Sequence, residues 1–83
     1  MVEKIDAITY HVIATTSIAD INDHLPYAIE VIGDATTLAG ILIHKFGRIP
    51  AMNEKIRLDE YEVTVLKKIR NTINLVQLKD LAK

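Results

Sequence analysis

The chain has 83 residues, no cysteine and a formal net charge of −1, and hydrophobic residues make up 49% of it. This length supports one small domain, and the lack of cysteine excludes a disulfide framework, a thiolate metal site and a cysteine nucleophile. The near-neutral charge gives no general attraction for nucleic acid or an anionic membrane, and no apolar run is long enough for a transmembrane helix.

A strand and a short helix follow a polar start, which we expect to be loosely ordered over residues 1–6. The segment 7–14 is rich in β-branched and aromatic residues, and this composition favours a strand. Ser17 is placed to cap a helix that ends near Leu25, because Pro26 cannot continue it.

The segment 27–36 connects this helix to the next one and shows no regular period. Gly33 and Asp34 add turn signals to it. The pattern does not decide between a brief strand and a plug for the core, and the apolar residues concerned are Ile29, Val31 and Ile32.

A second helix, over about 38–46, has a complete set of start and stop signals. Thr37 can cap its first turn, Gly47 can adopt the left-handed conformation that closes it, and Pro50 prevents its continuation. Its apolar residues recur at three- and four-residue spacing, so a sheet would cover them. Gly40 lies inside this helix, where glycine costs about 1 kcal/mol relative to alanine, so we expect another backbone to approach it closely.

Three strands complete the chain. Apolar and polar residues alternate over 55–65, which predicts two half-buried strands joined by a turn at Asp59-Glu60. A turn at Arg70-Asn71 leads into a last strand over 72–78. The result is a small single α+β domain over 7–81, with two short helices on a mixed, mainly antiparallel sheet and a C-terminal β-meander.

The motifs Thr37-Leu38-Ala39-Gly40 and Gly47-Arg48-Ile49-Pro50 bracket the second helix. With the alternating Val and Ile of the later strands, they make the segment 37–76 resemble the CorC/HlyC transporter-associated domain. Its members usually have a Gly-Asp turn after the proline, whereas Asn53-Glu54 stand here; asparagine tolerates the left-handed conformation that this turn requires. An Asp-Gly turn before the first helix is replaced by Ala14-Thr15, so that turn must take another form.

The resemblance implies placement rather than catalysis. Such domains end bacterial membrane proteins that carry a cytoplasmic pair of CBS domains and are linked to magnesium and cobalt efflux or haemolysin-like activity. This chain is then a fragment of a longer protein, a non-catalytic regulatory or interaction module on the cytoplasmic side of the inner membrane. The expected partners are the CBS domains of the parent chain or a second copy of the domain, and the membrane is reached only through the parent protein.

Two groups of side chains are candidate ligand sites. A divalent cation sensor would use Asp20, Asp23 and His24, which share a helix face, although a solvated face explains the same spacing. The family fold is also similar to an FAD-binding subdomain, although we expect no cofactor. FAD or an adenine nucleotide would be bound through Gly33, Gly40, Lys67 and Arg70. Protection of exposed strand edges is a simpler explanation for the basic residues.

Overall fold

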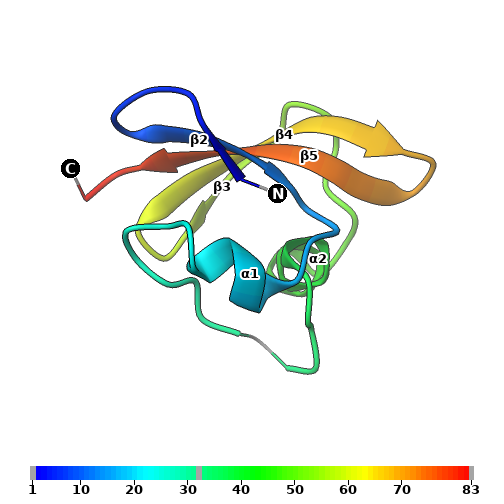
Figure 1. Ribbon diagram of the computed structural model, residues 1–83. Coiled ribbons are helices and arrows are strands. Elements are labelled where there is room, and N and C mark those ends of the chain that lie inside the picture. The colour runs from blue at the N-terminus through cyan, green and yellow to red at the C-terminus, as the bar shows by residue number, and fades with distance from the viewer. Residues whose placement is uncertain (1, 32, 83) are drawn as a thin grey trace.

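Five strands form one antiparallel sheet in the described part of the chain, and both helices pack on the same face of it (Figure 1). The computed structural model describes residues 2–31 and 33–82. The strands are β1 Val2–Lys4, β2 Thr9–Ile13, β3 Lys55–Leu58, β4 Tyr61–Ile69 and β5 Thr72–Asp80, and the helices are α1 Ile18–Asn22 and α2 Leu38–Phe46. The order β1-β2-β5-β4-β3 places β5 at the centre. The predicted α+β class and the meander of β3, β4 and β5 are confirmed.

Val2–Lys4 form an edge strand, whereas the sequence predicted a loose start over 1–6, of which Met1 lies outside the described residues. β1 pairs with β2, and Val2 lies opposite Val12 and packs against the core. Asp6 closes the turn between the two strands, because its carboxylate accepts a hydrogen bond from the Ile8 amide at 3.0 Å. The prediction was wrong because so short a strand needs only backbone partners and one apolar contact, which a polar composition does not exclude.

Helix α1 is shorter than predicted, and Ser17 forms no side-chain cap. The backbone of Ser17 instead forms an isolated bridge with Thr37, and the first amide of the helix donates to the Thr36 carbonyl oxygen at 2.8 Å. This contact between the starts of the two helices satisfies a free amide at the start of α1, which a side-chain cap was expected to do. The helix ends at Asn22 rather than near Leu25, because the next residues form tighter turns.

The connection 27–36 forms no strand in its described residues. Ile29 turns inward and is 2% exposed, so the segment plugs the core, as one of the two alternatives predicted. Val31 is exposed, and Ile32 lies outside the described residues.

Two polar side chains hold this connection on the core. The Asn22 Oδ1 accepts from the Ile29 amide at 2.8 Å, and its Nδ2 donates to the Ile29 carbonyl oxygen at 3.1 Å. The Tyr61 hydroxyl from β4 accepts from the Tyr27 amide at 3.0 Å and donates to the Tyr27 carbonyl oxygen at 2.7 Å. Burial raises the pKa of the Tyr61 phenol, so the hydroxyl keeps the proton that it donates.

The signals predicted for α2 are confirmed. The Thr37 Oγ1 accepts a hydrogen bond from the Gly40 amide at 3.1 Å, and Gly47 closes the helix with a φ of 75°. A Cβ added at Gly40 would lie 3.2 Å from the Ala35 Cβ. The close neighbour is thus the side chain of Ala35, whereas the sequence predicted a backbone; the nearest backbone atom is the Ala35 Cα, at 3.7 Å.

The turns of the meander lie where the sequence placed them. Asp59 and Arg70 adopt positive φ values of 53° and 58° at the two hairpins, and Asn53 has a φ of 63° before β3. Strand β5 runs past the predicted end at residue 78, because the Asp80 amide donates to the Ile8 carbonyl oxygen at 2.7 Å.

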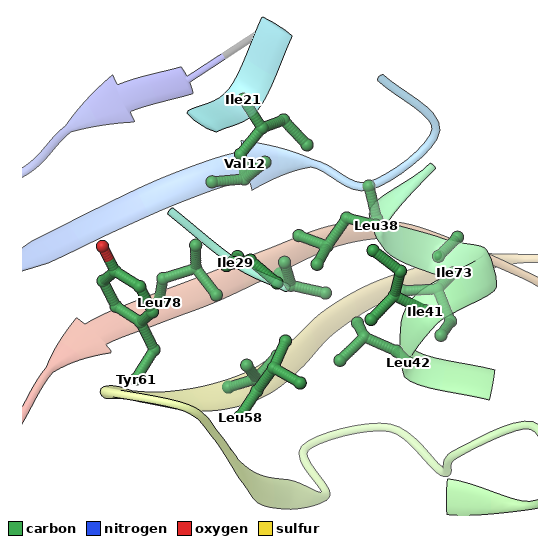
Figure 2. Packing of buried hydrophobic residues seen from close by; sticks show 14 of the residues in the cluster. Val12, Ile21, Ile29, Leu38, Ile41, Leu42, Leu58, Tyr61, Ile73 and Leu78 are labelled. Carbon is green, nitrogen blue, oxygen red and sulfur yellow. The ribbon is translucent and has the colours of Figure 1, made fainter. Parts of the chain in front are cut away.

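The core lies between the helices and the inner face of the sheet. Figure 2 shows Ile41 and Leu42 of α2 beside Ile73 of β5, and all three are fully buried. Aliphatic residues make up most of this core, as the scarcity of aromatic residues requires. The opposite face of the sheet carries no helix in the described part of the chain (Figure 1).

Replacing Tyr61 with phenylalanine tests the clamp on the connection. Tyr61→Phe removes both hydrogen bonds to the Tyr27 backbone while keeping the ring, so the free energy of unfolding should fall by about 1–2 kcal/mol. Urea denaturation followed by circular dichroism measures this difference. Tyr27→Phe is the matched control, since only the backbone of Tyr27 takes part in the clamp; an equal loss in both variants would contradict the assignment.

Candidate functional site

The three metal-ligand candidates lie around one hollow beside α1. It has a volume of about 390 Å³ and is lined by Asp20, Asp23 and His24, together with Val2 and Thr16. The predicted helix face is wrong, because only Asp20 lies in α1, while Asp23 and His24 lie in the turn that follows it. The fold still places the three side chains around one hollow, and Val2 of β1 lines it as well. We call this the acidic hollow.

The acidic hollow is not a preformed metal centre. Across residues 2–31 and 33–82, no group of three His, Cys, Asp or Glu side chains is arranged to hold a metal ion. Mg²⁺ commonly keeps several of its waters and binds through one or two carboxylates. Asp20 and Asp23 can provide that kind of contact, but not a complete set of protein ligands.

The structure does not bring the four cofactor candidates together. Gly33 and Gly40 lie on the helical side, and a Cβ at Gly33 would be 3.4 Å from the His44 ring. Lys67 faces the opposite side of the sheet, since it is paired with an outward-facing residue of β5, and Arg70 lies in the β4–β5 turn. The sheet therefore separates the glycines from Lys67.

Arg48 of the motif Gly47-Arg48-Ile49-Pro50 forms a bidentate ion pair with Glu54. In the sequence, Glu54 stood out only because Asn53-Glu54 replace the Gly-Asp turn that is usual in the family. The Glu54 Oε1 also accepts a hydrogen bond from the Ala51 amide at 2.8 Å. The guanidinium lies 5.6 Å from the centre of the Phe46 ring. Arg48 and Glu54 therefore fasten the loop between α2 and β3, and Arg48 needs no ligand to explain its place in the motif.

The outer face of the sheet, which no helix covers in the described part of the chain, carries a row of polar side chains across all five strands. Cross-strand pairing aligns one residue from each strand, and we call them the charged row: Glu3, His11, Gln77, Thr64 and Lys55. The His11 Nε2 and the Gln77 Oε1 are 3.2 Å apart within it. A hollow of about 240 Å³ lies on the same face, lined by Glu3, His11, Ile13 and Leu75.

A comparison with protein families identifies the fold's relatives. The CorC_HlyC family, described as a transporter associated domain, matches residues 3–82. The chain belongs to this family. The match covers the motifs around α2 and extends to the strand β1.

Solved structures of CorC_HlyC domains have the same fold. A region associated with CorC from Neisseria meningitidis, whose description names Mg²⁺ and Co²⁺, has a TM-score of 0.82 at 21% identity and covers 95% of this chain and 96% of its own. A haemolysin domain from Xylella fastidiosa, solved with Mg²⁺ and Mn²⁺, has a TM-score of 0.80 at 21% identity, with 96% of each chain covered.

A third relative comes from a CBS domain protein of Porphyromonas gingivalis, with a TM-score of 0.80 at 14% identity and 95% of each chain covered. At these identities the likeness concerns the fold. Comparison with curated proteins gives no match. No helix among the described residues is long and apolar enough to cross a membrane.

The Arg48–Glu54 pair predicts a pH dependence for the CorC_HlyC domain. Hydrogen bonds from Arg48, and then from the Ala51 amide, lower the pKa of the Glu54 carboxyl from 4.5. A lowered pKa contributes stability that is present above the unfolded-state value and is lost as pH falls through the folded-state value. The stability difference between wild type and Glu54→Gln should therefore be constant above pH 4.5 and shrink below it.

Urea midpoints measured from pH 3 to pH 7 test this dependence. Glu60→Gln is the control for losing one exposed carboxylate, because Glu60 lies in the β3–β4 turn. A difference between wild type and Glu54→Gln that persists unchanged at the acid end would show that the ion pair does not stabilise the loop.

Proposed function

We propose that this CorC_HlyC domain is a non-catalytic interaction module of a CBS-containing membrane protein, which acts on ion transport from the cytoplasmic side of the membrane. The family match over residues 3–82 carries the proposal. Two relatives support it: the description of one names a Mg²⁺ and Co²⁺ transporter, and that of the other names a CBS domain protein. The chain is then one part of a longer protein, and its partners are the CBS domains of that protein or a second copy of itself.

The use of the polar side chains supports the same proposal. Thr37, Asn22 and Tyr61 bind backbone groups of the chain, and Glu54 binds both Arg48 and a backbone amide. These residues fasten loops and helix ends rather than face a shared cavity. The surfaces that remain for function are therefore exposed faces suited to contact with another protein.

Association with the CBS pair tests the proposal. The domain and the CBS pair of its parent protein should associate in at least one nucleotide state, and calorimetry with and without an adenine nucleotide measures this. The parent protein without residues 2–82 should keep its membrane insertion and change its rate of Mg²⁺ or Co²⁺ transport. No association in any nucleotide state, together with unchanged transport by the shortened protein, would overturn the interaction role.

A divalent cation sensor is the second candidate, and the acidic hollow favours it. The hollow gathers two carboxylates and an imidazole from α1 and the turn that follows it. The Xylella relative was solved with Mg²⁺ and Mn²⁺. Because the side chains form no complete set of ligands, an ion there would keep part of its water shell. FAD binding has no such support, since its candidate residues lie on different sides of the sheet.

Thermal denaturation in the presence of Mg²⁺ or Mn²⁺ tests the cation sensor. An ion at about ten times its Kd stabilises the folded state by about 1.4 kcal/mol, which raises the Tm of a domain of this size by about 5–10 °C. The Asp20→Asn, Asp23→Asn double variant should lose this rise, whereas Asp34→Asn, which removes an exposed carboxylate outside the hollow, should keep it. An equal rise in all three proteins would show that the ion binds elsewhere.

A further inference from the structure

The charged row has opposite charges at its two ends. Glu3 stands on the edge strand β1, Lys55 stands on the edge strand β3, and Gln77 of the central strand lies midway between them. Adjacent strands lie about 4.8 Å apart, so β1 and β3 are about equally far from β5, on opposite sides of it. The row is therefore negative at the β1 edge, neutral at the centre and positive at the β3 edge.

A two-fold rotation about an axis parallel to β5, above the outer face, generates a second copy whose outer face lies against the first. In this arrangement the negative end of each charged row lies opposite the positive end of the other. Such a rotation preserves position along the strands and exchanges the two edges of the sheet, so β1 faces β3 of the second copy and β5 faces β5. Glu3 then faces the second copy's Lys55, and Lys55 faces the second copy's Glu3. The contact has two symmetric ion pairs and closes on itself.

We propose that the outer face of the sheet binds the same face of a second copy, forming a two-fold symmetric dimer with the charged rows reversed on one another. This inference rests on the proposed interaction role and names its surface and partner. Two sheets packed face to face lie about 10 Å apart, a spacing that side chains of the two outer faces fill. Gln77 faces the second copy's Gln77 on the axis, and His11 faces Thr64.

The hollow of 240 Å³ on this face supports the same arrangement. A second row of the sheet consists of Ile13, Leu75 and Lys67. Reversed on itself, this row brings Leu75 onto the axis and places the second copy's Lys67 over Ile13. The aliphatic part of a lysine can lie on Ile13 and Leu75, which line the hollow, while its ammonium group reaches Glu3 on the rim.

One contact in this arrangement is unfavourable. Lys79 is the residue of β5 in the row that also contains Thr9 and Glu62, so it faces the second copy's Lys79 across the axis. Only a few apolar side chains line the face, and a surface of this kind gives a weak, concentration-dependent dimer. Removing the charge of Lys79 should therefore strengthen the dimer, whereas removing an ion pair should weaken it.

A second copy fits this face better than an anionic membrane does. The outward-facing charged residues of the described strands are four basic and two acidic side chains, namely Lys55, Arg57, Lys67, Lys79, Glu3 and Glu62. Lipid-binding surfaces cluster basic residues, each contributing about 1 kcal/mol. Here Glu3 and Glu62 would also face the lipid, whereas a second copy presents a basic residue opposite Glu3.

Charge exchange at Glu3 and Lys55 tests the dimer by sedimentation equilibrium. Glu3→Lys and Lys55→Glu should each weaken self-association about tenfold, because each replaces two attractive contacts with two repulsive ones. The double variant should recover part of the affinity lost in each single variant. It should not reach the wild-type Kd, because Glu3→Lys also removes the contact with the second copy's Lys67. Lys79→Gln should lower the Kd. Lys45→Glu, an exposed change on α2, is the matched control and should leave the Kd unchanged.

A single introduced thiol gives an independent test, because the chain has no cysteine. Gln77→Cys should form a covalent dimer with a short bis-maleimide, whereas Lys45→Cys should not. A monomer at all concentrations, or a double variant as weak as the single ones, would overturn the dimer. Binding of the domain to phosphatidylserine vesicles would also overturn the dimer, if Lys55→Glu abolished that binding and if the vesicles competed with self-association.

The same variants separate this inference from the proposed function. If the domain binds the CBS pair of its parent but never binds itself, the dimer fails and the interaction role stands. If it binds itself and transport by the parent is unaffected by its removal, the dimer stands and the role in transport fails.

Discussion

The connection between the two helices packs onto the inner face of the sheet, and this packing fixes where both helices lie. Asn22 and Tyr61 each hold both the amide and the carbonyl group of one connection residue, so the backbone can cross the core without leaving polar groups unpaired. Ile29 then packs in the core that residues of α1, α2 and the sheet share (Figure 2). With the connection fixed, both helices are confined to one side.

Because both helices lie on one side of the sheet, the helical side and the outer face of the sheet differ in composition. The helical side contains nearly all of the buried apolar residues, and its polar groups are engaged in caps, clamps and the Arg48–Glu54 pair. The outer side of the sheet is left with alternating polar residues and a shallow hollow. The polar side chains described on the helical side therefore bind backbone groups or one another.

The elements that the sequence predicted correctly are those fixed by nearby residues. Thr37, Gly47 and Pro50 act within one turn of α2, and the hairpins depend on two residues each, so their signals are local. The errors at β1 and Ser17 arose where distant segments decide the outcome. The strand exists because β2 offers it a partner, and Ser17 forms no cap because its backbone pairs with Thr37.

The class of fold, the position of α2, the meander and the family could be predicted from the chain, because these follow from periodicity and from turn residues that act over a few positions. Tertiary structure alone decided which residues share a surface. It placed Lys67 on the side of the sheet opposite Gly33 and Gly40, paired Arg48 with Glu54, and aligned Glu3 with Lys55 across five strands. Such juxtapositions depend on strand order and register, which are set by long-range pairing and leave no local trace in the chain.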